Sequence, residues 1–130
     1  VYLDVRATSE FASGHPTGAY HIPLIEAGPA GRGMNEEFAA AVKALVADLG
    51  GDEGPELIVA CHAGGRSRQA CQLLAAEGVT RIVDFSGGWG GRAHPLGGEG
   101  LAGWADSDKP QSTTAEAGRD WPTLQSKIGG

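Results

Sequence analysis

Long apolar runs are missing from this sequence. Its uninterrupted apolar stretches are only a few residues long, so no segment could cross a bilayer as a helix. The first residues also lack the charged region and the apolar core of a secretory signal. We therefore expect a soluble, cytoplasmic protein with no membrane partner. The chain opens directly on residues 1–5, which already have the pattern of a strand, so a preceding targeting segment could be missing from it.

Positive charge and cysteine are both scarce. The chain has 10 Lys and Arg against 16 Asp and Glu and shows no basic stripe, so we expect no nucleic-acid partner. The 2 cysteines, Cys61 and Cys71, show no CxxC spacing, and the histidines show no HxxxH spacing. The sequence therefore predicts neither a disulfide scaffold nor a zinc site, and we expect no metal and no other cofactor. Two free thiols fit a reducing compartment.

Short apolar runs alternate along the chain with longer amphipathic stretches. This alternation is typical of parallel strands joined by helical crossovers, and it predicts an α/β fold. The length of 130 residues suits one domain with a core. Strands are predicted at 1–5, 19–22, 57–60 and 82–85. Helices are predicted as one turn at 8–11 closed by Gly14, as a long helix at 36–49, and as a helix from 65 or 66 to 77.

The helix at 36–49 has the clearest pattern. Asn35 is its predicted cap, and Gly50 and Gly51 end it. Its apolar side chains share one face, at Phe38, Val42, Leu45, Val46 and Leu49.

In the last part of the chain, glycines interrupt the regular spacing of apolar residues that would indicate a helix or a strand. From about Leu96 to Gly130 the sequence predicts no regular element. We therefore divide the chain into a domain at 1–95 and a Gly-rich extension at 96–130, which is either packed on the domain or disordered. If it packs, the apolar side chains that could pin it are Trp104, Trp121, Leu124 and Ile128.

The stretch CHAGGRS at 61–67 carries the chemistry. It places Cys61 at the end of a buried strand, followed by a short glycine-containing turn, Arg66 and a helix. Gly64 and Gly65 allow the backbone to curl and to turn several N–H groups toward one centre. The helix start and the arginine favour the thiolate form of a cysteine, so Cys61 is a nucleophile candidate. A cysteine alone is more often a small buried apolar residue, but a packing turn needs neither a thiol nor an arginine.

Several separate stretches together resemble the rhodanese-domain sulfurtransferases. CHAGGRS is similar to the CxxGxRS active-site signature of that family, and Leu3-Asp4-Val5-Arg6 to its LDVR strand. Residues 10–23 resemble its EFxxGHIxGAxNIP segment, and residues 83–89 resemble the region that closes the domain. The resemblance covers about residues 1–95 and implies a central parallel sheet flanked by helices on both faces. The usual strand and helix before LDVR have no counterpart here, and neither does the extension.

The resemblance also implies roles for the loop. Cys61 would take a sulfane sulfur from a small anionic donor such as thiosulfate, hold it as a persulfide and pass it to a thiophilic acceptor. That acceptor would be cyanide, a thiol or a sulfur-accepting protein. Substrate binding would fall to His62, Ala63, Gly64, Gly65, Arg66 and Ser67, with Arg66 on the donor or on leaving sulfite.

For residues outside the loop we predict structural rather than catalytic roles. Asp4 and Arg6 are expected to brace the neighbouring loops. His15 and His21 are expected to be hydrogen-bonding turn residues rather than metal ligands, because neither has a partner at ligand spacing. Cys71 is expected in the core.

Two other functions stay open. A cysteine phosphatase or arsenate reductase uses the same strand, loop and helix, but places five residues between cysteine and arginine, whereas only four separate Cys61 from Arg66. A non-catalytic partner-binding module is the second alternative. The presence of Cys61, Gly64 and Arg66 argues against it, while Trp104 and Trp121 could serve a partner surface.

Overall fold

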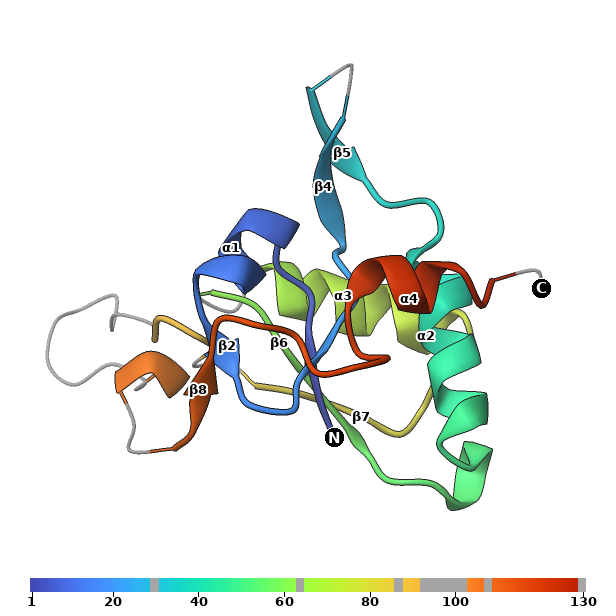
Figure 1. Ribbon diagram of the computed structural model, residues 1–130. Helices are drawn as coiled ribbons and strands as arrows, with labels where there is room; N and C mark the ends of the chain where they lie inside the picture. Colours follow the sequence, from blue (N-terminus) through green and yellow to red (C-terminus); the bar gives the residue numbers. More distant parts are fainter. Residues whose placement is uncertain (29–30, 63–64, 86–87, 92–102, 107–108, 129–130) are drawn as a thin grey trace, which may run out of the picture.

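The computed structural model describes residues 1–28, 31–62, 65–85, 88–91, 103–106 and 109–128 (Figure 1). Its centre is a sheet of four parallel strands in the spatial order β3-β1-β6-β7. These strands are β1 (Tyr2–Asp4), β3 (Tyr20–His21), β6 (Leu57–Ala60) and β7 (Ile82–Asp84). Each lies within a predicted strand, so the parallel sheet of the predicted α/β fold is confirmed.

The three predicted helices are present as α1 (Thr8–Ser13), α2 (Phe38–Asp48) and α3 (Gly65–Ala76). Helix α2 begins at Phe38, later than predicted, because the residues before it form a turn in which the Asn35 side chain accepts the N–H of Glu37 at 3.1 Å. Three of its five predicted core positions, Phe38, Val42 and Leu45, are buried, and Val46 and Leu49 are half-buried.

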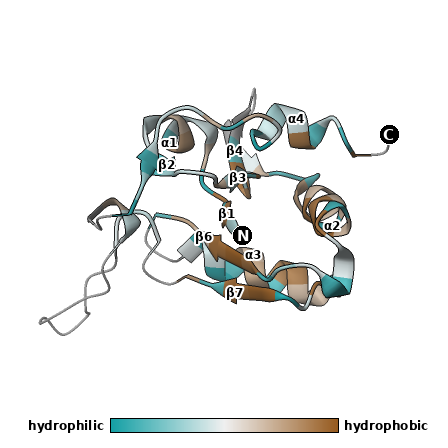
Figure 2. Ribbon diagram, turned by 60° about the horizontal axis from the view of Figure 1, so that its bottom comes forward, coloured by the Kyte–Doolittle hydropathy of each residue, from teal (hydrophilic) through white to brown (hydrophobic). Residues whose placement is uncertain are grey.

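The core joins the sheet to these helices, and Figure 2 shows β6 and β7 as largely apolar strands. Three of the four residues of β6 are buried, whereas those of β7 are half-buried or exposed. Helix α3 packs against β6 and β7. The buried side chains include Leu3, Val5, Phe38, Val42, Leu45, Leu57, Val59, Ala70 and Leu74. This packing holds the carboxyl ends of β1, β6 and β7 side by side, at the edge where open α/β sheets bind ligands.

A hairpin that the sequence did not predict projects from the body (Figure 1). It consists of β4 (Ile25–Gly28) and β5 (Gly31–Met34), paired antiparallel. Its base is fixed by Asn35, whose N–H donates to the Leu24 carbonyl at 2.7 Å and whose side-chain amide donates to the Pro23 carbonyl at 2.9 Å. The hairpin is therefore anchored where α2 begins.

The expectation of no regular element after about Leu96 is wrong. Strand β8 (Gln111–Ser112) pairs antiparallel with β2 (His15–Pro16), a single 3-10 turn spans Trp104–Asp106, and α4 spans Trp121–Gln125. Leu124 is buried in the same core as the sheet, with Trp121 and Ile128 half-buried against it. The described part of the extension is thus folded onto the domain. None of the described helices is long and apolar enough to cross a membrane.

Candidate active site

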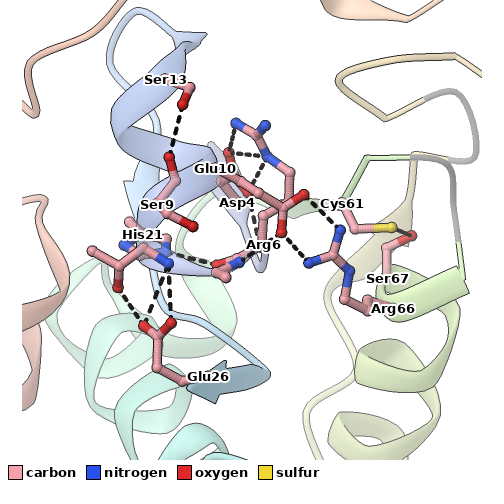
Figure 3. Close-up of polar contacts among 12 residues, drawn as sticks. Asp4, Arg6, Ser9, Glu10, Ser13, His21, Glu26, Cys61, Arg66 and Ser67 are labelled. Atoms are coloured by element: carbon pink, nitrogen blue, oxygen red, sulfur yellow. Dashed lines mark hydrogen bonds and ion pairs between the residues drawn. The ribbon is translucent and has the colours of Figure 1, made fainter. Parts of the chain in front are cut away.

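Cys61 follows β6 at the carboxyl edge of the central sheet. It is 2% exposed, and its sulfur faces the first turn of α3 (Figure 3). The neighbouring strands end in carboxylates at the same edge, β1 in Asp4 and β7 in Asp84. A thiol, a helix start and two acidic side chains therefore meet where the parallel strands end.

The loop after Cys61 is described only at its two ends. His62 is exposed, and Gly65 is the first residue of α3. Ala63 and Gly64 lie outside the described residues. The predicted cradle of amide groups, and the substrate-binding role assigned to Ala63 and Gly64, therefore stay predictions.

The first half of the loop is held by residues 88–90. The N–H of Trp89 donates to the Cys61 carbonyl at 2.7 Å, and the N–H of Gly90 donates to the His62 carbonyl at 2.9 Å. Gly88 has a φ of +57°, and a Cβ there would lie 2.2 Å from the Cys61 carbonyl oxygen. The imidazole of His62 lies so close to Gly90 that a Cβ would meet it at 2.2 Å. Gly88 is needed for this close approach of backbone to backbone, and the hydrogen bonds from Trp89 and Gly90 fix the backbone at Cys61 and His62.

Arg66 in the first turn of α3 is bound by Glu10 of α1 (Figure 3). Its Nη1 lies 2.5 Å from Glu10 Oε1 and its Nη2 lies 2.9 Å from Glu10 Oε2. This bidentate pair holds the pKa of Glu10 at about 2, through the hydrogen bond from Arg66 first and its charge second, against the effect of burial. The sequence assigned Arg66 to an anionic donor, and the structure shows that this donor would have to share the guanidinium with Glu10.

Ser67 connects the sulfur to a residue that sequence reasoning missed. Its hydroxyl oxygen lies 3.7 Å from Cys61 Sγ and donates to Asp84 Oδ1 at 2.6 Å, and Ser67 is fully buried. A signal for Asp84 was present, since it is a carboxylate that ends a short apolar strand next to β6. Glu10 was quoted only as part of a motif, because its partner lies 56 residues away in sequence.

Asp4 and Arg6 form a buried ion pair. Arg6 Nη2 lies 2.8 Å from Asp4 Oδ2, with side-chain exposures of 3% and 1%. The same Nη2 donates to the Gly14 carbonyl at 2.6 Å, and the guanidinium stacks over the Trp89 ring at 5.1 Å. The pair therefore ties the end of β1 to the end of α1 and to the segment that holds the Cys61 loop.

The two histidines of the early turns hydrogen-bond to backbone. His15 Nδ1 donates to the Phe11 carbonyl at 2.7 Å, and His21 Nε2 donates to the Arg6 carbonyl at 2.8 Å. Both rings stack on Phe11. Burial lowers the pKa of His21 and favours its neutral form. Among the described residues, no group of three His, Cys, Asp or Glu side chains could hold a metal ion.

Cys71 is a second free thiol, half-buried on α3. Burial, and then the negative charge of Asp84, raise the pKa of Cys71 to about 11. It is therefore protonated at neutral pH and packs against the core cluster.

Comparison with known proteins assigns this arrangement to a family. A family model described as a rhodanese-like domain matches residues 1–92. The chain is 40% identical over 88 residues to Protein HIGH ARSENIC CONTENT 1, mitochondrial, from Arabidopsis thaliana, covering 68% of this chain and 49% of that protein. The chain therefore spans about half the length of that relative.

Two further relatives from Arabidopsis thaliana are named as thiosulfate sulfurtransferases. Thiosulfate sulfurtransferase 16, chloroplastic, is 35% identical, over 68% of this chain and 69% of its own. Thiosulfate sulfurtransferase 18 is 33% identical, over 88% of this chain and 74% of its own. Among solved structures, Rv0390 from M. tuberculosis matches with a TM-score of 0.59 at 22% identity, over 88% of this chain and 84% of its own, a likeness that concerns the fold.

Proposed function

The chain belongs to the rhodanese-like domain family, and on that premise we propose that it is a sulfurtransferase that carries a sulfane sulfur on Cys61. The observation that supports this most is the position of Cys61. Its thiol is buried at the end of β6, against the first turn of α3 and beside the Ser67 hydroxyl. A thiol at such a helix start is suited to nucleophilic chemistry.

The proposed reaction has two half-steps. The Cys61 thiolate attacks the outer sulfur of thiosulfate, a sulfur–sulfur bond forms to Sγ, and sulfite leaves with the electron pair of the bond that breaks. Cyanide or a thiol then attacks the outer sulfur of the persulfide, which gives thiocyanate or a new persulfide and returns Cys61 as thiolate. No external oxidant or reductant is needed.

Arg66 is the proposed contact for the anionic donor and for leaving sulfite. Two of its guanidinium nitrogens serve Glu10, and a guanidinium carries five N–H donors, so others stay available to an oxyanion. The amides from His62 to Ser67 would stabilise the charge on the outer sulfur of the persulfide. A protein acceptor is also proposed, since one similar protein is named a putative sulfur carrier protein. We propose a reducing, cytoplasmic setting that keeps both cysteines out of disulfides.

Intact-mass measurement after incubation with thiosulfate tests this function. Wild type should gain one sulfur atom and lose it to cyanide as thiocyanate. Cys61→Ser should gain none, and Cys71→Ser, the matched control on the other thiol, should behave as wild type. If wild type gains no sulfur from thiosulfate, 3-mercaptopyruvate or glutathione persulfide, the catalytic proposal fails and a partner-binding module becomes the better hypothesis.

Arsenate belongs in the same assay as a second substrate. One relative has a name that refers to arsenic content, and an arsenate reductase or cysteine phosphatase was an alternative from the sequence. The four-residue spacing between Cys61 and Arg66 makes a smaller ring than those enzymes use, which favours sulfur over a tetrahedral oxyanion. The assay could instead show that the protein releases arsenite from arsenate in the presence of a thiol reductant, depends on Cys61 for this and takes up no sulfur. That result would favour arsenate reduction over sulfur transfer.

A further inference from the structure

The folded extension is hydrogen-bonded to the segment that supports the nucleophile loop. The contact is made by the 3-10 turn at Trp104–Asp106, drawn in orange in Figure 1. The N–H of Trp104 donates to the Gly88 carbonyl at 2.9 Å. The N–H of Ala105 donates to the Trp89 carbonyl, also at 2.9 Å. Two consecutive peptide groups of the extension are therefore bound, backbone to backbone, to two consecutive residues of the domain.

Gly103, just before this turn, allows the two backbones to approach so closely. It is buried, and a Cβ at this position would lie 2.2 Å from the Gly91 nitrogen and 2.4 Å from the Trp89 carbonyl oxygen. Both are backbone atoms, so neither can move aside as the end of a flexible side chain would. Any other residue at position 103 must therefore push the turn and residues 88–91 apart.

Trp89 lies between the extension and the nucleophile. Its carbonyl accepts from Ala105, and its own N–H donates to the Cys61 carbonyl at 2.7 Å. The next residue also reaches the loop, since the N–H of Gly90 donates to the His62 carbonyl at 2.9 Å. This segment thus binds the extension through its carbonyl groups and the loop through its N–H groups. A shift of the turn reaches the backbone of the nucleophile through a single residue.

The side chain of Trp104 fixes the turn to the central sheet. Its ring meets the Tyr2 ring edge-on, with centroids 5.4 Å apart, and its Nε1–H donates to the Pro110 carbonyl at 3.1 Å. Tyr2 is the first residue of β1, which pairs in parallel with β6, the strand that Cys61 follows. The turn and the nucleophile are therefore held by neighbouring strands of one sheet.

The indole ring of Trp89 is held by the domain itself. The Arg6 guanidinium stacks over this ring at 5.1 Å, and Gly14 lies so close that a Cβ there would be 2.9 Å from a ring carbon. These contacts act on the side chain of Trp89, whereas the extension acts on its backbone. The extension therefore supplies backbone hydrogen bonds that the ring contacts cannot replace.

We propose that the 3-10 turn at Trp104–Asp106 is a positioning element of the candidate active site, with Trp104 as its anchor. The turn holds residues 88–91 and, through them, keeps the backbone of Cys61 in the place from which its sulfur reacts. The inference deepens the proposed function and rests on it for its catalytic meaning. It gives the extension a part in the site, although the family model matches only residues 1–92.

This route predicts a separation of kinetic effects. Arg66, the proposed contact for the donor, is oriented by Glu10 of α1 rather than by residues 88–91. A disturbance of the turn should therefore lower kcat and leave the KM for thiosulfate unchanged, because donor binding stays intact and only the alignment of the reacting sulfur is lost. The measurement is the initial rate of thiocyanate formation, at a temperature where circular dichroism shows each variant to be folded.

Gly103→Ala is the sharpest variant, because its new Cβ must displace backbone atoms of residues 88–91. We expect kcat to fall about tenfold, since a small misplacement of a reacting group has effects of this order. Gly33→Ala is the matched control. Nothing lies within 4 Å of a Cβ at Gly33, and neither glycine has a positive φ, so the two variants differ in the contact alone. Equal kcat values in the two variants would overturn the inference.

Variants of Trp104 test the anchor without a new clash, and they carry the test if Gly103→Ala fails to fold. Trp104→Leu removes the ring contact with Tyr2 and the hydrogen bond to Pro110, and kcat should fall about fivefold. Trp104→Phe keeps a ring and should stay within about twofold of wild type. The control is Trp121→Leu, in the part of the extension that packs on the core through α4, and it should leave kcat and KM unchanged. An equal fall of kcat in Trp121→Leu would overturn the specific role of the turn.

Amide hydrogen exchange tests the same contact without any sulfur donor. In Gly103→Ala and Trp104→Leu, the N–H groups of Trp89 and Gly90 should exchange about tenfold faster than in wild type, because their segment opens locally. Amides in the middle of α2 follow global unfolding and should change less. Faster exchange in a protein that takes up no sulfur supports the hold of the turn on the loop and removes the sulfurtransferase proposal alone. Unchanged exchange at Trp89 and Gly90, or faster exchange with an unchanged kcat, overturns the inference.

Discussion

The guanidinium of Arg66 and the carboxylate of Glu10 form two parallel hydrogen bonds between α3 and α1, at 2.5 and 2.9 Å. Their side chains are 19% and 32% exposed, so solvent screens the pair only in part. The pair fixes the direction of a guanidinium at the start of the helix that faces Cys61, and it also neutralises part of its charge. Glu10 is thus an internal competitor for any anion that Arg66 is to bind.

Replacing Glu10 by Gln should tighten the binding of an anionic donor. The amide keeps one hydrogen bond to Arg66 but removes the competing charge, and a partly exposed ion pair is worth about 0.2–1 kcal/mol. We expect the KM for thiosulfate to fall about threefold with little change in kcat, since tenfold corresponds to about 1.4 kcal/mol. Initial rates of thiocyanate formation measure both constants.

The matched control is Glu77→Gln, which breaks the exposed ion pair between Glu77 and Lys43 near the other end of α3. It should leave both constants unchanged. A KM that rises in Glu10→Gln would mean that orientation of Arg66 by Glu10 matters more than competition, and would contradict the prediction.

Stability should depend on pH through Glu10. Its pKa is lowered from 4.5 to about 2 in the folded state, so its contribution is fully present above about pH 4.5 and is lost as the pH falls through about 2. Allowing for the screening at a side chain 32% exposed, we expect Glu10→Gln to cost about 1 kcal/mol at neutral pH. Urea unfolding of both proteins at a series of pH values should show this difference shrinking toward zero in acid. A difference that is constant with pH would contradict the assignment.

Local patterns in the sequence were sufficient to predict the parallel sheet and α2, because the spacing of apolar residues there matches the spacing of the residues that the fold buries. The β4–β5 hairpin was missed because its strands, IEAG and GRGM, are short and Gly-rich, so that neither has the run of β-branched or aromatic residues that predicts a strand. Helix α4 was missed because five residues with a proline show too little period. Around Cys61, the Glu10–Arg66 and Ser67–Asp84 contacts join side chains 56 and 17 residues apart, so no local pattern predicts them.

Helix α4 should be part of the cooperative folding unit. Leu124 is 3% exposed and lies in the same cluster as Leu3, Phe38 and Leu57. Leu124→Ala should therefore lower the free energy of unfolding by about 2–3 kcal/mol, while the exposed neighbour change Gln125→Ala should alter it by less than about 0.5 kcal/mol. Urea denaturation followed by circular dichroism measures both. An unchanged midpoint for Leu124→Ala would show that α4 adds nothing to the core.

Comparing alanine substitutions at Gly88 and Gly78 distinguishes the cost of backbone strain from damage to the candidate active site. Both have positive φ, +57° and +87°, so the backbone strain of alanine alone should cost each variant about 1–2 kcal/mol of stability. Only at Gly88 would the new Cβ lie 2.2 Å from the Cys61 carbonyl oxygen, whereas nothing lies within 4 Å at Gly78. Gly88→Ala must therefore displace the backbone of Cys61, and sulfur uptake should fall about 10- to 100-fold, because small displacements of a reacting group cost this much. Gly78→Ala should keep the wild-type rate at a temperature where both variants are folded. Equal rates in the two variants would show that residues 88–90 do not position the nucleophile.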